Sequence, residues 1–285
     1  MIANRQIMNE WLARADKEGF AIPHFNYNDI WDMRAIVEAA EELRAPVIIA
    51  CIPRVTNAHG TARLGSLAYA TAEQAKVPVF IHLDHSPTIE DCIDCVDNKF
   101  TAVMIDGSKL PLADNIASVK TVSDYAHPRN VLVEAEVGKI LGSSDEAAFG
   151  GGDFLVEVAD VVELTQKAPV DMVAIGIGTA HGFYEGTPEI NFKRLEEVND
   201  VVDTPLVLHG GTGIPLEDVR HAIKLGINKV NVGTIIRYTY MSTLRKELNE
   251  RGDSCHPLDL YKPVVEAMKV PIRDWIKVCM ADGKA

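Results

Sequence analysis

Residues Val77–Cys95 read VPVFIHLDHSPTIEDCIDC, and the pattern of this stretch changes once. The part up to Leu83 is an apolar run typical of a buried strand, and the second half has the spacing of a helix. Asp84 and His85 stand between the two patterns. Two ionisable groups at the end of a buried strand are costly unless a partner compensates them. The stretch therefore predicts a strand–helix unit with reactive groups at the carboxyl end of its strand.

The same strand–helix pattern repeats along the chain. Helical stretches, such as residues 29–44 and 61–76, separate short apolar runs. This alternation predicts parallel strands with crossover helices, and eight units favour a closed (β/α)8 barrel, a TIM barrel, over an open doubly wound sheet. The expected strands are Phe20–Asn26, Pro46–Ile52, Val77–His85, Thr101–Gly107, Val131–Gly138, Asp171–Gly178, Pro205–Gly211 and Lys229–Thr234.

The chain is expected to form a single α/β barrel domain over residues 1–285, because no linker rich in Pro, Gly or Ser divides it. From about Arg237 the pattern predicts a C-terminal helical extension. Residues 1–20 read as an amphipathic helix rather than a signal segment. No apolar run reaches the ~18 residues that span a bilayer, so we expect no membrane association.

Composition excludes several classes of protein. Apolar residues make up 47% and charged residues 24%, the balance of a soluble globular protein. A net charge of -13 argues against general binding to nucleic acid or anionic membranes. Five scattered cysteines predict a reduced, cytoplasmic protein. Cys92 and Cys95 form a CxxC in a helical pattern, which we interpret as two thiols on one helix; a redox or metal pair is the alternative.

Polar groups gather where the expected strands end, which is where barrel enzymes build their sites. His85, His181 and His209 end three different strands. Three neutral imidazoles with an open fourth position are the usual catalytic zinc arrangement. One histidine at a strand end is more often structural, but three beside Asp84 favour a metal. The other six histidines lack this joint placement and are interpreted as structural or surface residues, with His24 in IPHFN left open.

Two further patterns belong to the same strand ends. GGTG at 210–213 and NVGT at 231–234 each precede a helical pattern. Such loops after strands seven and eight form phosphate sites in barrels, although glycines also serve in tight turns. Glu134 and Glu136 share one face of the fifth strand, with Asp106 on the fourth. Either a second metal position or a lysine or arginine partner would explain these acids.

Six blocks of this sequence resemble those of a known family. They are HLDH, VMIDGS, VEAEVG, GTAHGFY, LHGGTG and KVNVGT, in this order over nearly the whole chain. They resemble the zinc-dependent class II aldolases, particularly the fructose-bisphosphate and tagatose-bisphosphate enzymes. The resemblance implies reversible cleavage of a ketose 1,6-bisphosphate, or a related ketose 1-phosphate, to dihydroxyacetone phosphate and an aldehyde such as glyceraldehyde 3-phosphate. It also implies a role in carbohydrate metabolism such as glycolysis, and a homodimer or homotetramer.

The resemblance assigns roles to individual positions. His85, His181 and His209 correspond to the zinc ligands, and Asp84 to the acid/base that handles the proton of the C4 hydroxyl. Asp106 and Glu136 correspond to acids of a second metal position. Groups around Gly182 and Gly210 correspond to a site for a monovalent cation, Na⁺ or K⁺. The substrate-binding positions are Gly182, Gly210, Gly211, Thr212, Asn231, Val232, Gly233 and Thr234.

The chain departs from the family in the loop after strand five. The family's Gly-Gly-x-Glu-Asp motif has a glutamate expected to exchange the C3 proton, and its position falls at Ser144. Either Glu146 or Asp145 takes over this proton exchange through a shifted loop, or the proton is exchanged in another way. We assign the role to Glu146. Arg237 is expected to bind a distal phosphate or other anion, or to be a surface arginine. A metal-dependent sugar-phosphate lyase or epimerase, and a non-catalytic partner subunit of an aldolase, are the alternative functions.

Overall fold

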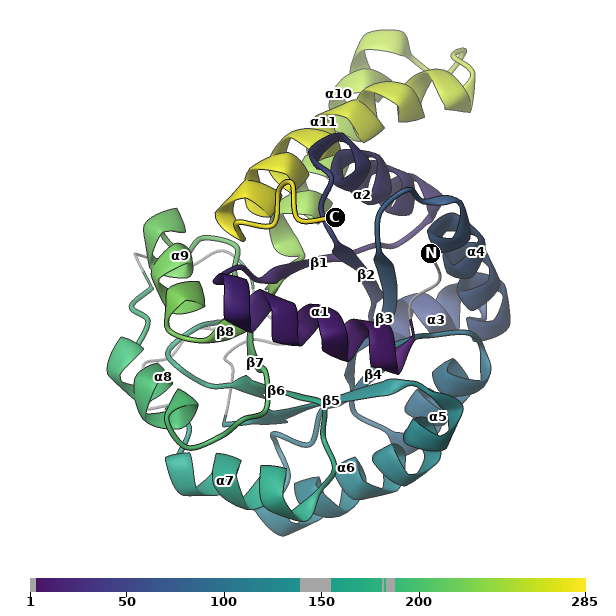
Figure 1. The fold of residues 1–285 in the computed structure, drawn as a ribbon. Helices are drawn as coiled ribbons and strands as arrows, with labels where there is room; N and C mark the ends of the chain where they lie inside the picture. The colour runs from purple at the N-terminus through teal and green to yellow at the C-terminus, as the bar shows by residue number, and fades with distance from the viewer. Residues whose placement is uncertain (1–3, 139–154, 181, 183–187) are drawn as a thin grey trace.

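The strands form the barrel that the strand–helix alternation predicts. The computed structural model describes residues 4–138, 155–180, 182 and 188–285. In this part of the chain, eight parallel strands close in chain order, and β8 pairs with β1 (Figure 1). The strands are β1 (Ile22–Asn26), β2 (Val47–Cys51), β3 (Val79–Ser86), β4 (Ala102–Ile105), β5 (Leu132–Val137), β6 (Met172–Ile175), β7 (Leu206–Leu208) and β8 (Ile227–Val232).

Every expected strand overlaps an observed one, and the differences lie at the ends. β8 begins at Ile227, before the expected start at Lys229, and β3 extends past His85 to Ser86. The expected (β/α)8 TIM barrel is therefore confirmed.

Helices surround the barrel, and local sequence explains how they begin. In α5, for example, the Asp91 N–H donates to the hydroxyl of the N-cap Thr88. Cys92 and Cys95 both lie on the buried face of this helix. The outer ring consists of α2 (Ile30–Leu43), α3 (Pro53–His59), α4 (Thr61–Gln74), α5 (Ile89–Asp97), α6 (Leu112–Ala126) with the 3-10 turn His127–Arg129, α7 (Val158–Lys167), α8 (Phe192–Asn199) and α9 (Leu216–Lys224).

The first helix, α1 (Arg5–Glu18), lies across one opening of the barrel (Figure 1). It buries Met8, Leu12 and Ala15 against the core, as its amphipathic pattern predicts. We call this end, where the strands begin, the floor. The opposite end, where the strands finish, is the rim.

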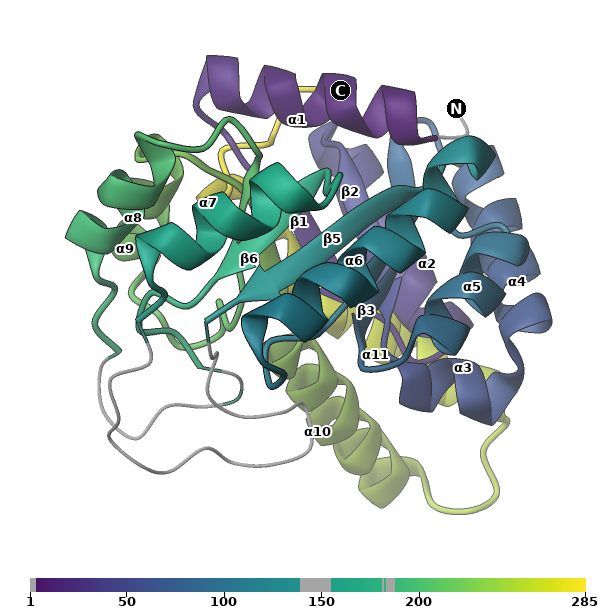
Figure 2. The same ribbon diagram turned by 90° about the horizontal axis from the view of Figure 1, so that it is seen from below.

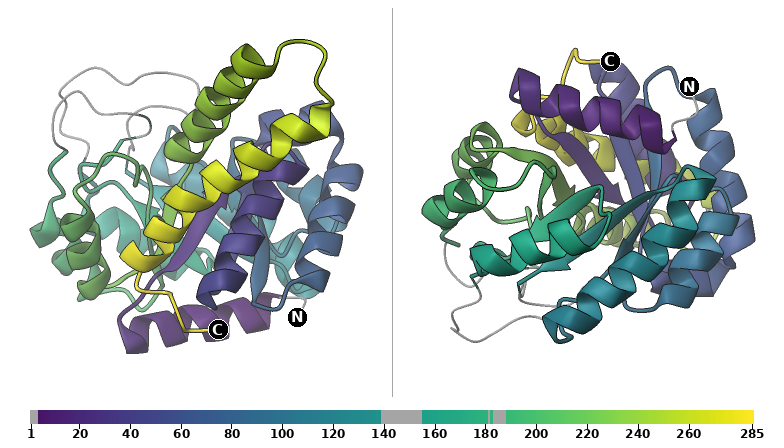
Figure 3. Two further views of the ribbon diagram at one scale, coloured as in Figure 1. Left: turned by 90° about the horizontal axis from the view of Figure 1, so that it is seen from above. Right: turned by 60° about the horizontal axis from the view of Figure 1, so that its bottom comes forward.

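The C-terminal helical extension leaves the barrel at the rim. Helix α10 (Thr234–Arg251) projects away from the strands, and α1 lies at the opposite end of the molecule (Figure 2). Helix α11 (Pro257–Val278) returns beside α10 and packs on α2 (Figure 3). Trp31 of α2 stacks on Tyr261 of α11 with ring centroids 4.6 Å apart. The extension is thus packed on one side of the barrel.

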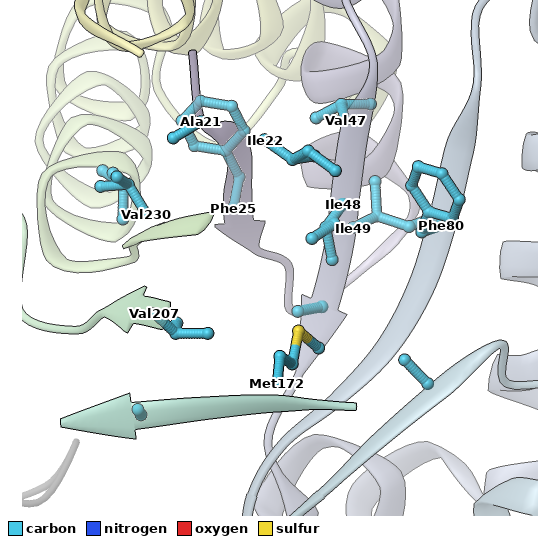
Figure 4. Close-up of a cluster of buried hydrophobic side chains, with 14 of the residues drawn as sticks. Ala21, Ile22, Phe25, Val47, Ile48, Ile49, Phe80, Met172, Val207 and Val230 are labelled. Atoms are coloured by element: carbon cyan, nitrogen blue, oxygen red, sulfur yellow. The ribbon is translucent and has the colours of Figure 1, made fainter. Parts of the chain in front are cut away.

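The core fills both faces of the sheet. Strand residues alternate between the lumen and the helix layer, so residues paired across neighbouring strands share a face. Ile22 pairs with Lys229, and Glu134 pairs with Met172. Apolar and polar side chains therefore lie next to one another in the lumen. Figure 4 shows part of the apolar cluster, including Ile22, Phe25, Ile48, Phe80, Met172, Val207 and Val230.

Within the described ranges, no helix combines the length and the apolar character needed to cross a membrane.

Candidate functional site

A β-bulge in β3 explains why two ionisable residues stand side by side. Leu83 pairs with a residue of β4, and Ser86 pairs with the residue only two positions further along β4. Asp84 and His85 therefore lie opposite a single residue, Met104. His85 has a positive φ of 48°, which is unusual for a residue other than glycine. The bulge brings both side chains to the inside of the rim, with Asp84 Oδ1 4.0 Å from His85 Nε2.

His85 lies among acids and a second histidine. Its Nδ1 is 3.0 Å from Asp106 Oδ2 and 3.8 Å from Glu136 Oε2. Its Nε2 is 2.9 Å from Nδ1 of His209, which comes from the loop after β7. Burial lowers the pKa of His85, but the charges of Asp84, Asp106 and Glu136 outweigh burial and raise it to about 10. This position therefore favours positive charge.

The two acids of β5 have different partners. Glu134 Oε1 is 2.9 Å from His209 Nε2, and Glu134 Oε2 is 2.9 Å from the ammonium of fully buried Lys229. Glu136 Oε2 is buried and has no hydrogen-bond partner among the residues that the structure describes. Burial and the charge of Asp106 raise the pKa of Glu136 to about 8, against the opposing effect of His85. A lysine partner thus accounts for the burial of Glu134, whereas Oε2 of Glu136 remains available to a ligand.

Asp84 is held from two sides. Asn26 Nδ2 donates to its Oδ2 at 2.8 Å, and Asn231 Nδ2 donates to its Oδ1 at 3.2 Å. Burial raises the pKa of Asp84, but His85 and His24 outweigh burial and hold it well below its usual value. The side chain is therefore an ionised carboxylate with a fixed orientation, as a proton acceptor requires.

These groups could hold a metal ion. Ligand atoms of Asp84, His85 and His209 lie within 4.8 Å of one another, and so do those of His85, Asp106 and Glu136. Imidazole nitrogen and carboxylate oxygen are ligands that Zn²⁺ binds. The unpartnered oxygen of Glu136 and the field around His85 both fit a cation. The residues present therefore fit a divalent metal of the zinc type.

Some predicted site residues lie outside the described residues. His181, the third expected histidine, is one of them, so only His85 and His209 are brought together here. Ser144, Asp145 and Glu146 also lie in an undescribed range, 139–154. Their roles stay predictions.

The two glycine-containing loops lie side by side at the rim. The Gly211 N–H donates to the carbonyl of Asn231 at 3.1 Å. Gly210 has a φ of 71°, and a Cβ on it would lie 2.1 Å from the carbonyl oxygen of Ala180, so this position requires glycine. The backbone after β7 therefore packs closely on the backbone after β6.

The second loop leads directly into α10. Val232 ends β8, Gly233 is the N-cap of α10, and Thr234 is its first residue. The N–H of Ile235 donates to Thr212 Oγ1 at 3.3 Å, which ties the helix to the first loop. Two predicted substrate-binding positions remain. Gly182 has a φ of 102°, which favours glycine, and Arg237 is exposed on α10.

Two of the six remaining histidines do share a placement with other polar groups, contrary to expectation. His24 and His82 are fully buried in the lumen, next to Asp84 and Glu134. Their spacing carried a signal, because His24 is two residues before Asn26 and His82 two residues before Asp84. Residues two apart on a strand share a face.

Two further residues at the site were not singled out from sequence, although the same spacing rule reaches both. Asn26 ends the first expected strand, and Lys229 is two residues before Asn231. Lys229 Nζ donates to Asn231 Oδ1 at 2.7 Å, so the lysine supports the asparagine that holds Asp84.

Comparison with known proteins gives concordant results. A family model described as class II fructose-bisphosphate aldolase matches residues 6–284. The YdjI aldolase of Escherichia coli K12 is 28% identical, with a TM-score of 0.87 and 100% of both chains covered. A candidate fructose-1,6-bisphosphate aldolase of Coccidioides immitis is 26% identical, with a TM-score of 0.88 over 100% of this chain and 99% of that one.

A third structure agrees in fold. The fructose-bisphosphate aldolase of Campylobacter jejuni is 19% identical, with a TM-score of 0.84 over 99% of this chain and 97% of that one.

Proposed function

This chain belongs to the class II fructose-bisphosphate aldolase family, and from that premise we propose that it is a zinc-dependent aldolase of phosphorylated ketoses. The proposed substrate is a ketose 1,6-bisphosphate of the fructose or tagatose type, or a related ketose 1-phosphate. Reversible retro-aldol cleavage would release dihydroxyacetone phosphate and an aldehyde such as glyceraldehyde 3-phosphate. The observation that carries the proposal is the approach of His85 Nε2 to His209 Nδ1, at 2.9 Å, beside the carboxylate of Asp84.

Zinc is proposed to bind at these imidazoles. His85, His209 and His181 are the proposed ligands, and Asp106 and Glu136 are available for a second position. The buried, unpartnered Oε2 of Glu136, 3.6 Å from His209 Nδ1, supports a cation here. When bound, zinc would supply Lewis-acid stabilisation of the negative charge that C3–C4 cleavage leaves on the ketose half.

Proton transfer is assigned to Asp84. The carboxylate would accept the proton of the C4 hydroxyl during cleavage and return it during condensation. Asn26 and Asn231 would keep the carboxylate oriented, because each donates to a different oxygen. Both amides hydrogen-bond the charged form and favour it. Glu146 is the proposed residue for proton exchange at C3.

The paired loops are proposed to bind the phosphate of the dihydroxyacetone half. Positions 210–212 and 231–234 lie together at the N-terminus of α10, where backbone N–H groups and the helix dipole favour an anion. Gly182 is assigned to the same half of the substrate. Arg237, exposed on the first turns of α10, is proposed to bind a distal phosphate or other anion. A monovalent cation, Na⁺ or K⁺, is proposed near Gly182 and Gly210.

The remaining expectations are also proposals. We propose one barrel domain, a homodimer or homotetramer, and a role in the cytoplasm in carbohydrate metabolism such as glycolysis. All five cysteines are free, and four of them are buried, which supports a reducing compartment.

The decisive experiment is a coupled assay for dihydroxyacetone phosphate with fructose and tagatose 1,6-bisphosphates. Each sugar is tested with chelator-treated protein and again after zinc is added back. We expect release that needs zinc, and the ratio of the two rates identifies the preferred configuration at C4. Zinc-loaded protein that converts a ketose phosphate without releasing dihydroxyacetone phosphate would point to an epimerase. Protein without bound metal and without turnover would contradict the proposal and favour a partner subunit.

A further inference from the structure

A second group of polar side chains lies in the lumen, deeper than the imidazoles of the proposed zinc site. His24 comes from β1 and His82 from β3, and both are 0% exposed. All four of their ring nitrogens are buried without a hydrogen-bond partner in the part of the chain that the structure describes. A buried polar group left unpaired costs about 1–3 kcal/mol. Two such imidazoles side by side therefore indicate that something else binds there.

The distances in this cluster fit a shared metal ion better than direct hydrogen bonds. His24 Nε2 is 3.5 Å from Asp84 Oδ2, at the limit of a hydrogen bond. One ligand atom from each of His24, His82 and Asp84 lies within 4.8 Å of the others. Bonds of about 2.1 Å to a tetrahedral zinc ion place neighbouring ligands roughly 3.4 Å apart. The observed nitrogen–oxygen distance is close to that edge.

We propose that His24, His82 and Asp84 form an inner metal site that binds a divalent ion of the zinc class. The site differs from the proposed catalytic one in its histidines. It also uses the other side of the Asp84 carboxylate, because His24 approaches Oδ2 whereas His85 is 4.0 Å from Oδ1. Two imidazoles and a carboxylate are a ligand set that zinc accepts, with a fourth position left for water or for Glu134, whose Oε2 is 3.4 Å from His82 Nε2.

The charge of the lumen can accommodate a second ion. Within the described residues, four acidic side chains line the upper lumen, and the ammonium of Lys229 lies among them. Its ammonium is already bound by Glu134 and Asn231. The four carboxylates are Asp84, Asp106, Glu134 and Glu136.

Occupancy of the inner site would affect Asp84. A cation on Oδ2 withdraws negative charge from the carboxylate and makes it a weaker proton acceptor. Excess zinc should therefore inhibit turnover, and His24→Ala should require more zinc for the same inhibition. This consequence, unlike the site itself, depends on the proposed function.

The site is tested by counting bound metal in the full-length protein. Chelator-treated protein is titrated with Co²⁺, which is followed by visible absorption, and bound metal is measured after gel filtration by elemental analysis. We expect two ions per chain in the wild type and one in His24→Ala, which should keep the absorption of the other site. His85→Ala should lose the complementary signal. His127→Gln, which changes a histidine at the floor, is the matched control and should keep two ions.

Equal numbers of bound ions in the wild type and in His24→Ala would overturn the inner site. If His24→Ala fails to fold, as judged by circular dichroism, His82→Asn provides the same comparison. The proposed function has a separate readout, because loss of one ion in His24→Ala with no effect of His85→Ala would retain the inner site and contradict the catalytic one.

Discussion

Acids at the floor and at the rim of this barrel have opposite surroundings. At the floor, Asp171 accepts hydrogen bonds on both oxygens. Arg5 Nε and Asn9 Nδ2 donate to Oδ1 at 2.7 and 3.3 Å, and the Val133 N–H donates to Oδ2 at 2.9 Å. His127 Nε2 lies 2.8 Å from Oδ2 as well. This carboxylate joins α1, the turn after α6 and the start of β5, and none of its oxygens is left for a ligand.

At the rim, Glu136 is not saturated in this way. Its Oε2 has no hydrogen-bond donor among the described residues, and the side chains that donate to Asp84 are two neutral amides. Burying such groups costs stability unless a ligand compensates them. The same residue type therefore stabilises the fold at one end and prepares a binding site at the other. The partners of each acid, more than its residue type, separate the two roles.

The largest effect is expected from Asp84→Asn at the rim. An amide keeps the shape of the side chain but cannot accept the proton, so kcat should fall by about 10²–10⁴-fold. The measurement is steady-state release of dihydroxyacetone phosphate by zinc-loaded protein. Asp171→Asn at the floor is the matched control, and its folded fraction should keep kcat near the wild-type value. Near-normal turnover by Asp84→Asn would remove Asp84 from the proposed chemistry.

Asp171→Ala tests the floor. This change leaves the Arg5 guanidinium without its buried partner and unties α1, so the free energy of unfolding should fall by about 3 kcal/mol. Urea denaturation followed by circular dichroism measures the loss. Asp124→Ala, in the exposed ion pair with Lys120, is the control and should have little effect. Equal losses in the two variants would mean that the floor acid has no special role.

Asp32 in the first turn of α2 tests how an incompletely satisfied acid affects stability. Its Oδ1 has no partner in the described ranges, and burial, with the charge of Asp29, raises its pKa from 3.8 to about 6. The folded protein therefore binds this proton more tightly than the unfolded chain. Ionisation of buried Asp32 therefore lowers the free energy of unfolding. This loss is absent well below pH 3.8, grows as the pH rises, and is complete above the folded pKa.

Asp32→Asn should remove that penalty. The stability of the variant relative to wild type should rise by about 2 kcal/mol between about pH 4.5 and pH 7, as measured by urea denaturation at each pH. Asp124→Asn, at an exposed position of α6, controls for the loss of one charge. A relative stability of Asp32→Asn that falls as the pH rises would have the wrong sign for this explanation.

The smallest expected effect concerns the backbone of the β3 bulge. His85 has a φ of 48°, which glycine adopts freely and alanine does not. In the metal-free protein, His85→Gly should therefore be more stable than His85→Ala by about 1 kcal/mol. The same pair of substitutions at Ser86, which lies in the regular ladder, should show the reverse order. An identical order at both positions would show that the bulge stores no strain.

Barrel enzymes place their polar groups at the carboxyl ends of the strands, and this rule allowed much of the fold and part of the site to be predicted. It identified Asp84, His85 and His209 because each stands at the end of an apolar run that we interpreted as a buried strand. It did not identify the partner of Glu134, because Lys229 reaches it only after β8 closes on β1. Such a contact joins residues far apart in sequence, and no local pattern records it. His24 and His82 were missed although each lies two residues before a polar residue of its own strand, Asn26 and Asp84, which is a local signal.

The β-bulge in β3 has a consequence for protein engineering. In a regular strand, neighbouring side chains face opposite sides, so a base and a ligand on one face must be separated by a residue between them. The bulge at Asp84 and His85 removes that requirement by inserting one residue. Backbone shape therefore places the acid and the imidazole on one face, whereas surrounding side chains such as Asn26 and Asn231 orient the acid. Another parallel barrel could acquire an adjacent acid and imidazole by a single-codon insertion near the end of one strand.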